Sequence, residues 1–269
     1  SYARRKMVSV YNERFANSLK RYRNGQEGRY TYVNWGYNTI GVFQNQDQIN
    51  NWPVNIDGKG NTTLLPGDFI VEDVNGDGRI DSQDERPIAY QDNSSVAPQP
   101  IINGGLTLGF DWKGIDLSAD FSLAGGYAFT PNWETRWPFQ NGRTLVRETQ
   151  FKNRWRHEDP FDPNSAWIPG DVPALRFTAR EYVSWNRNLD YWTTNVVAFR
   201  LRSLEIGYTL PRKWLAAARI QKVRFYVNTY NLFSIDNVKK YGVDPEIADR
   251  NGMQYPQNRV VNIGANLTF

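Results

Sequence analysis

The chain of 269 residues contains no cysteine and a single histidine, His157. Disulfide bonds, thiolate zinc sites and a cysteine nucleophile are therefore excluded, and one imidazole is too few for a two-histidine metal site. Long apolar runs are also missing, because no stretch approaches the roughly 20 residues that a membrane-spanning helix requires. These absences exclude most familiar metalloenzymes and a helical membrane protein.

An excess of charge of one sign is absent as well. The 32 basic and 28 acidic residues leave a formal net charge of only +4, and the basic residues are scattered along the chain. We therefore expect no nucleic-acid partner. Aromatic residues, in contrast, make up 14% of the chain and include 10 Trp, whereas disordered chains are poor in aromatics. The sequence predicts a folded protein of one large β domain or two ordinary ones.

Alternation of apolar and polar residues predicts β-strands from residue 100 onward. Two such segments flank the pair Lys113-Gly114, so residues 102–125 are expected to form a hairpin. Three further strands are predicted over residues 197–208, 222–233 and 261–269. Each is long enough to cross a bilayer when tilted. One face of each strand suits lipid or a protein core, and the other suits water.

Two architectures share this alternation, a soluble β-sandwich or barrel and a transmembrane β-barrel. Residues 126–195 separate two of the predicted strands and are rich in Trp, Arg, Pro and Asn. So long a connection is uncommon in compact soluble domains, whereas outer-membrane barrels combine short turns with long extracellular loops. We therefore expect an all-β chain whose antiparallel strands form a segment of a transmembrane β-barrel with long extracellular loops.

The first hundred residues have a less regular pattern. Residues 7–23 are expected to form a strand that frays into a basic loop, and residues 30–43 a strand kinked at Gly36. Residues 50–66 are expected to be a loop.

Residues 73–84 match the spacing of a calcium-binding loop, with Gly78 at the sixth position, where the chain must turn sharply. The twelfth position holds an aspartate in place of the usual bidentate glutamate, which predicts weaker binding. The sequence leaves two alternatives open, a structural Ca²⁺ or Mg²⁺ site and a metal-free turn closed by Asx hydrogen bonds. The candidate ligands are Asp73, Asn75, Asp77, Arg79 (through its carbonyl), Asp81 and Asp84.

Tryptophans in the long connections have three possible roles: bilayer-interface girdle, loop packing and stacking on a ligand. The candidate substrate or partner contacts are Trp52, Trp133, Trp137, Trp155 and Trp167. No catalytic residue is predicted, because no spacing singles out a carboxylate pair and the motifs of serine hydrolases and nucleotide-binding proteins are absent. We therefore do not expect an enzyme.

Several motifs, taken in order, resemble the C-terminal portion of SusC-like TonB-dependent transporters, the nutrient-import outer-membrane barrels of Bacteroidetes. Each motif alone is weak, but their order makes coincidence implausible. Residues 39–40 and Ala198 depart from the family pattern, and neither departure affects the expected fold. The resembling segments are residues 36–45 (GYNTIGVFQN), 66–68 (PGD) followed by 73–81 (DVNGDGRID), 199–211 (FRLRSLEIGYTLP), 230–233 (YNLF) and 242–246 (GVDPE).

The resemblance implies a barrel of about 22 strands that encloses an N-terminal plug domain. It further implies a SusD-like surface lipoprotein that lids the lumen, energy from the TonB complex, and import of an oligosaccharide or peptide through the outer membrane of a Gram-negative bacterium. Phe269 resembles the terminal aromatic residue that the outer-membrane assembly machinery reads.

Residues 1–269 are expected to be the C-terminal portion of such a transporter, with six to eight strands and without the plug and the N-terminal barrel strands. Because open sheet edges are not tolerated in lipid, these strands must pair with others from the rest of the protein. The alternative is a soluble extracellular β protein that binds carbohydrate and is stabilised by calcium. That alternative accounts for the aromatic residues and the calcium-type loop, but not for the order of the motifs.

Overall fold

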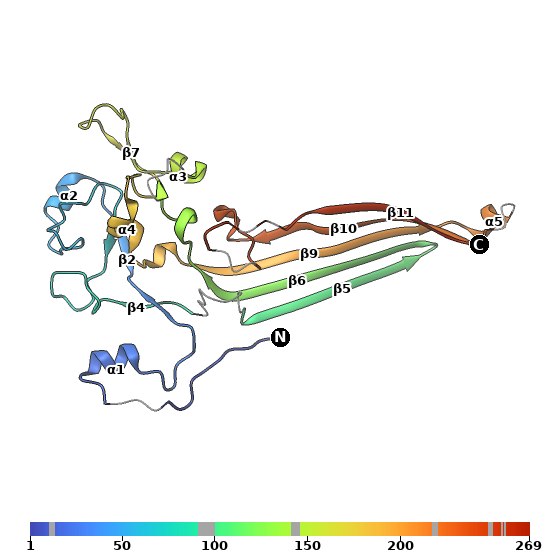
Figure 1. The fold of residues 1–269 in the computed structure, drawn as a ribbon, viewed down its shortest axis with the longest axis horizontal. Coiled ribbons are helices and arrows are strands. Elements are labelled where there is room, and N and C mark those ends of the chain that lie inside the picture. The colour runs from blue at the N-terminus through green and yellow to red at the C-terminus, as the bar shows by residue number, and fades with distance from the viewer. Residues whose placement is uncertain are drawn as a thin grey trace.

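A computed structural model describes residues 1–10, 14–90, 100–140, 146–216, 220–246, 250–253, 255 and 257–269. Its dominant feature is a five-stranded antiparallel sheet with the order β11-β10-β9-β6-β5 (Figure 1). The predicted hairpin and the three further predicted strands are all present in this sheet. The strands are β5 (Ile102–Trp112), β6 (Ile115–Phe129), β9 (Thr194–Thr209), β10 (Lys222–Asp236) and β11 (Val260–Thr268).

The two ends of the sheet carry connections of very different length. At one end Lys113 and Gly114 join β5 to β6, and both have positive φ, as a two-residue hairpin turn requires. Helix α5 (Arg212–Leu215) and the C-terminus lie at this same end (Figure 1). The long connections all lie at the opposite end. This asymmetry is the one expected of an outer-membrane barrel.

One face of the sheet is apolar across all five strands. Leu106 of β5 pairs with Phe121 of β6. Ile206 of β9 pairs with Val227 of β10, which in turn pairs with Ile263 of β11. These side chains do not form a buried core, since Leu106 is 53% exposed and Ile263 is 82% exposed. Side chains that stand in register stabilise a sheet, but a face so exposed needs a further apolar environment.

The long connections fold together at the end of the sheet into a loop module, defined as the described residues of 34–89 and 130–193 (Figure 1). Its short elements are β1 (Asn34–Gly36), β2 (Thr39–Val42), α2 (Gln46–Asn50), β3 (Phe69–Val71), β4 (Arg86–Ala89), η1 (Trp133–Thr135), α3 (Glu148–Lys152), β7 (Arg156–His157), β8 (Trp167–Ile168), η3 (Ala179–Glu181), α4 (Val183–Asn186) and η4 (Asp190–Trp192).

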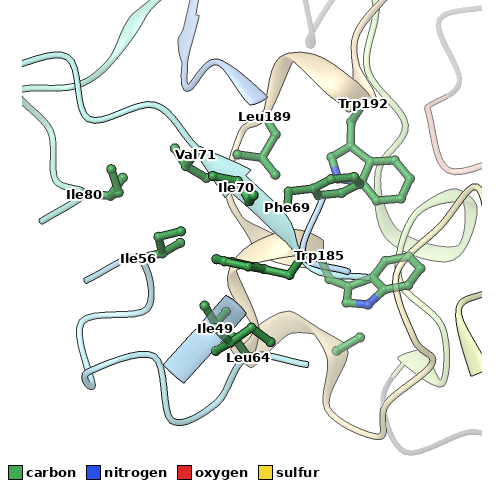
Figure 2. Close-up of a cluster of buried hydrophobic side chains, with 12 residues drawn as sticks. Ile49, Ile56, Leu64, Phe69, Ile70, Val71, Ile80, Trp185, Leu189 and Trp192 are labelled. Atoms are coloured by element: carbon green, nitrogen blue, oxygen red, sulfur yellow. The ribbon is translucent and has the colours of Figure 1, made fainter. Parts of the chain in front are cut away.

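The main hydrophobic core of the described residues lies in this module (Figure 2). The indole N–H of the fully buried Trp185 donates to the carbonyl of Ala174 at 3.2 Å, and that of Trp192 donates to the carbonyl of Ser184 at 2.8 Å. Buried indoles require such partners. The core consists of Phe43, Ile49, Ile56, Leu64, Phe69, Ile70, Val71, Ile80, Ala179, Trp185, Leu189 and Trp192.

The N-terminal region differs from expectation. The strand predicted over residues 7–23 is wrong, because α1 (Ser18–Asn24) is a helix; residues 11–13 lie outside the described residues. The side chain of Asn17 accepts the amide of Lys20 and so caps this helix. The single strand expected over residues 30–43 is instead divided into β1 and β2, which pair with β4 and β3 respectively. None of the helices in the described ranges is long and apolar enough to cross a membrane.

The described residues place five long strands in the main sheet, not the six to eight expected. The difference arises from residues 34–89, which form two two-stranded sheets and the short helix α2 inside the loop module. Their apolar residues are buried in a core shared with residues 130–193. They therefore do not form strands with one lipid-facing and one water-facing side.

Candidate functional site

The face opposite the apolar one carries charged groups that link neighbouring strands. Arg224 of β10 donates from Nε to Oδ1 of Asp116 on β6 at 2.9 Å, and from Nη2 to Oε1 of Glu205 on β9 at 2.7 Å. Gly207 leaves room for the guanidinium, since a Cβ there would lie 2.4 Å from Nη2. Charge-assisted hydrogen bonds of this kind are among the stronger ones in proteins. Three strands are thereby joined on the polar face.

A second ionic cluster lies nearer the loop module and holds the connection between β10 and β11. Arg200 of β9 is buried and donates to Oδ1 of Asp244 at 2.8 Å and approaches Oε2 of Glu246 at 3.0 Å. Arg202 contacts the other oxygen of Glu246 at 2.7 Å. Both carboxylates belong to the connection, so the ion pairs fasten it onto the polar face.

A β-bulge between β6 and β9 adds polar groups to this face. Asp120 stands opposite Ser203 whereas Phe121 stands opposite Leu201, which leaves Arg202 as the extra residue. The Ser203 hydroxyl donates to Asp120 at 2.6 Å, and Arg202 Nε donates to a β6 serine at 3.0 Å. Bulges change the direction of side chains in this way. The successive residues Arg202 and Ser203 therefore both contribute polar groups to the same face.

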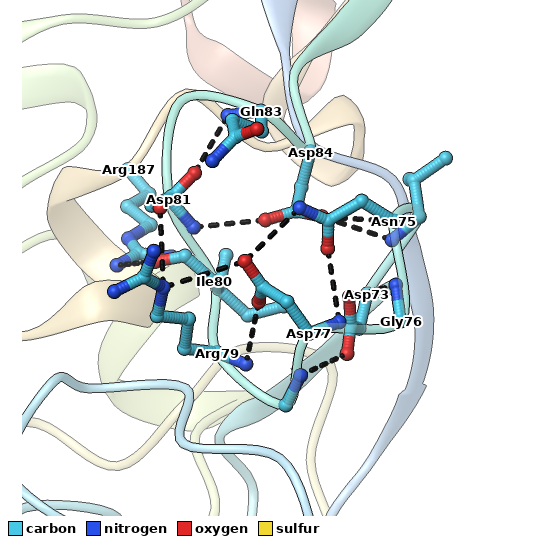
Figure 3. A network of polar contacts seen from close by, with 12 residues as sticks. Asp73, Asn75, Gly76, Asp77, Arg79, Ile80, Asp81, Gln83, Asp84 and Arg187 are labelled. Carbon is cyan, nitrogen blue, oxygen red and sulfur yellow. Dashed lines mark hydrogen bonds and ion pairs between the residues drawn. The ribbon is translucent and has the colours of Figure 1, made fainter.

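The predicted calcium-type loop is closed by its own carboxylates (Figure 3). Asp73 accepts the amides of Gly76 at 2.8 Å and Gly78 at 2.9 Å, one on each oxygen. Asp84 is fully buried and accepts the amides of Val74 at 3.0 Å and Asp81 at 2.8 Å. Asn75, Asp77 and Asp81 each accept the amide two residues further on, as in Asx turns. Together these hydrogen bonds preorganise the loop.

The oxygen set suits a hard cation chemically, but Arg79 competes for it. Its Nε lies 3.4 Å from a carboxylate oxygen of Asp77 and 3.4 Å from one of Asp81. Desolvation alone would raise the pKa of Asp77, but hydrogen bonds from Asn75 and from the Arg79 amide outweigh it and lower that pKa. Within the described residues no group of three or more acidic, His or Cys side chains is arranged to hold a metal ion. The cation site stays a prediction.

Backbone pairing fixes the calcium-type loop to the loop module. Asn55 donates its amide to the Gly78 carbonyl at 2.8 Å and accepts the Ile80 amide at 3.2 Å. The Ile80 side chain is buried in the core, and Arg187 Nη2 donates to its carbonyl at 3.1 Å. The loop is therefore a structural part of the module.

The five candidate tryptophans have different environments. Trp155 is 5% exposed and packs against Gly67. Trp52 lies edge-on to Phe43, with ring centroids 5.5 Å apart, and packs against the core. Trp167 packs on the ring of His157 at 4.1 Å in the β7–β8 hairpin. For these three, loop packing is the observed role.

Trp133 and Trp137 lie together, with centroids 5.9 Å apart. The guanidinium of Arg180 lies 4.6 Å from the Trp137 ring and 5.4 Å from the Trp133 ring. Trp137 also donates its indole N–H to the Trp185 carbonyl at 2.8 Å. Trp133 is 41% exposed, so of these two it presents more surface to a partner. A role in substrate or partner contact stays a prediction for all five.

Phe269 follows the last residue of β11 and is 77% exposed. Its role as a barrel assembly signal stays a prediction. Sequence reasoning missed both ionic clusters, although charged residues at alternate strand positions were the available signal.

Comparisons with known proteins agree with the fold. No protein-family model matches the chain. It is 26% identical over 256 residues to TonB-dependent receptor P3 of Formosa agariphila, covering 87% of this chain and 22% of that protein. It is 25% identical over 223 residues to TonB-dependent receptor P39 of the same organism, covering 78% of this chain and 19% of that protein. The chain thus spans about a fifth of the length of these relatives.

Solved structures of the RagAB peptide importer have a similar fold. The closed-closed state matches with a TM-score of 0.57 and 23% identity, over 90% of this chain and 24% of the matched chain. The open-open state matches with a TM-score of 0.54 and 20% identity, over 88% and 22%. Together with the similarity to TonB-dependent receptors, this fold supports the expected outer-membrane location. The resemblance to SusC-like TonB-dependent transporters is confirmed, and the chain has the fold of a segment of such an outer-membrane β-barrel.

Proposed function

We propose that this chain forms part of the barrel wall and the extracellular loops of a TonB-dependent transporter that imports nutrients through the outer membrane. One observation carries the proposal: a single five-stranded sheet has an exposed apolar face and an opposite face lined with ion pairs. Lipid would cover the first face, and the second would line a water-filled lumen. The relatives are named receptors and importers, which supports a role in transport and not in catalysis.

The rest of the protein would supply the plug, the contact with the TonB complex and the remaining strands. Both edge strands, β5 and β11, have only one strand partner among the described residues, and a barrel in lipid must satisfy both edges. From the order of its motifs, we propose that residues 1–269 are the C-terminal portion of such a barrel.

We further propose a SusD-like surface lipoprotein as the partner at the loop end. Exposed apolar side chains on the loop module support this contact. Phe161 at the β7–β8 hairpin is 95% exposed and Phe177 is 67% exposed, with the ring of Phe177 stacked on that of Phe139. Large apolar side chains at such positions are typical of protein interfaces. The cargo would be an oligosaccharide or a peptide, and the solved relatives are peptide importers.

A calcium or magnesium ion in the 73–84 loop would act structurally. Asp73 and Asp84 already hold the loop through backbone amides, and no described base is poised beside them for catalysis. A bound cation would neutralise the carboxylates and displace Arg79 from them.

The test of the transport proposal is purification of the native complex from cell membranes in mild detergent, followed by identification of every polypeptide in it. A complex that contains plug-domain peptides and a surface lipoprotein is the expected result. A soluble 31.2 kDa species without these partners would contradict it and would favour the calcium-stabilised carbohydrate-binding protein. The exposed apolar face already argues against that alternative.

A further inference from the structure

The loop module contains a pocket of about 450 Å³ beside β2. This volume falls within the roughly 300 to 1,000 Å³ of typical ligand sites. Its walls come from four parts of the chain that are distant in sequence: residues 39–42, Gly67 with Phe69, Trp155 with residues 170–172, and residues 190–191. Neither ionic cluster of the sheet contributes to it.

A strand edge without a second strand partner among the described residues faces this pocket. The segment 188–190 begins to pair in parallel with the chain just before β2, since the Tyr37 amide donates to the Asn188 carbonyl at 2.9 Å and the Asp190 amide donates to the Tyr37 carbonyl at 3.0 Å. The Asp190 side chain then accepts the Thr39 amide at 2.9 Å, and the chain turns away into η4. Pairing on this side of β2 therefore stops at Thr39.

Beyond Thr39, β3 is the only strand that pairs with β2 among the described residues. The Gln44 side-chain amide donates to the Val42 carbonyl at 2.8 Å, and a pairing peptide would displace it. All four residues of β2 line the pocket. Because alternate strand residues point to opposite faces, a cavity that touches four in succession reaches the strand's backbone. An extended peptide can pair with such an edge.

The pocket is acidic. Its lining includes Asp171 and Asp190 and contains no Lys, Arg or His. Within the described residues the hydrogen bonds of the Asp190 carboxylate, from Thr39 and Tyr191, both use Oδ1, so Oδ2 is available to a ligand. Asp171 is exposed, and in the described part of the chain the Tyr191 hydroxyl donates to its carbonyl and not to its carboxylate. The charge therefore favours a cationic group.

The aromatic lining does not provide a platform for a sugar ring. Trp155 is 5% exposed and Phe69 is 2% exposed, so their ring faces are covered. Tyr191 is 39% exposed, but one of its faces packs on Phe69 with centroids 4.3 Å apart. Recognition of a peptide backbone and a basic side chain fits this lining better than stacking on carbohydrate.

We propose that this pocket binds a short extended peptide with a basic side chain, whose backbone pairs with the edge of β2 and whose cationic group lies between Asp171 and Asp190. The inference rests on the proposed import function and specifies its cargo as basic peptides. The Ile40 side chain, which is 58% exposed, stands at the pocket and would contact the peptide.

The test measures binding of the capped pentapeptide acetyl-Ala-Ala-Lys-Ala-Ala-amide to the native detergent-purified complex by calorimetry. The matched probe replaces Lys by norleucine, which has no charge. Because a hydrogen bond between charged groups is stronger than a neutral one, the lysine peptide is expected to bind at least about tenfold more tightly. A lysine peptide N-methylated on alternate backbone amides should bind more weakly, since it cannot donate to the strand edge.

Two variants locate the site. Asp171→Asn/Asp190→Asn keeps the Oδ1 acceptor for Thr39 and should abolish the preference for lysine over norleucine. The control Asp47→Asn/Asp162→Asn makes the same charge change outside the pocket and should retain it. If the double Asn variant fails to fold, Ile40→Lys should instead weaken binding of the lysine peptide by repulsion.

Equal affinity for the two peptides, or a lysine preference that survives the pocket substitutions, would overturn the inference. Tighter binding of cellopentaose than of either peptide, lost in the pocket variants, would overturn it also. These results would leave the transport function intact, because co-purification of the plug and the lipoprotein tests that function independently.

Discussion

Arg176 and Asp68, 108 residues apart in the sequence, form an ion pair in the interior of the loop module. Arg176 Nη1 also donates to the Thr63 carbonyl at 2.7 Å, and Asp68 Oδ2 accepts the Leu65 amide at 2.8 Å. The guanidinium lies 4.3 Å from the centre of the Tyr182 ring. This pair joins the two long connections and so holds together the walls of the peptide pocket.

Removal of either partner should destabilise the loop module strongly. We expect Asp68→Ala to cost about 3 to 5 kcal/mol, because it leaves a buried guanidinium without its counterion. Hydrogen exchange of residues 63–71 and 174–192 would measure the loss of protection. The double variant Asp68→Ala/Arg176→Met should cost less than the sum of the single variants. Additive costs would mean that the pair is not coupled.

A charge on the apolar face of the sheet should destabilise the barrel in the membrane. Phe225→Arg places a guanidinium on the expected lipid side and should cost up to about 2 to 4 kcal/mol, depending on depth in the bilayer. The control Asn266→Arg lies on the polar face of the adjacent strand, where water would solvate the charge. Outer-membrane levels of the folded protein should fall for the first variant only. A similar fall for both would argue against a lipid-facing role for Phe225.

Acid should loosen the turn that contains Asp57. Burial alone would raise the pKa of this carboxyl, but hydrogen bonds from the Thr63 hydroxyl and amide and from the Lys59 and Asn61 amides outweigh it and lower the pKa below 3.8. A carboxyl whose folded-state pKa is depressed contributes stability above its unfolded pKa and loses it as the pH falls through the folded pKa.

Protection of residues 57–63 from hydrogen exchange should therefore decline as the pH is lowered below about 4. Asp57→Asn should be less protected at neutral pH and should lose this pH dependence. A wild-type turn whose protection is unchanged in acid would refute the assignment.

Calcium should stabilise the loop module if the 73–84 loop binds it. After removal of divalent ions with a chelator, added Ca²⁺ is expected to raise the melting temperature, because an ion that binds only the folded state stabilises it. Asp73→Ala should eliminate this increase, whereas Asp47→Ala, outside the loop, should retain it. Absence of any Ca²⁺-dependent shift in the wild type would favour the metal-free Asx turn.

The strands were predictable because their alternation and turn chemistry are local. Residues 106–112 alternate without interruption, and Lys113-Gly114 supplies the two positive φ angles of the turn. Helix α1 was missed because it is only seven residues long, although Asn17 was an available cap signal. A short helix with no buried residue leaves little periodicity to read.

The polar clusters and the pocket were not predictable from the chain alone. Asp116 and Arg224 are 108 residues apart, and their contact depends on the register of three strands and on a bulge that no motif announced. The pocket likewise unites four separate stretches that carry no common motif. Spacing along the sequence identifies local loops such as residues 73–84, but not sites assembled by tertiary structure.

The most direct test of the central claim asks which face of β11 contacts lipid. Because the chain contains no cysteine, Ile263→Cys and Asn262→Cys each introduce one reactive thiol into it, on opposite faces of the same strand. The two variants are labelled with a fluorophore in outer-membrane vesicles that contain spin-labelled lipid. The barrel assignment predicts strong quenching at position 263 and, at position 262, labelling by water-soluble thiol reagents with little quenching. Equal water access at both positions, without lipid quenching, would contradict it.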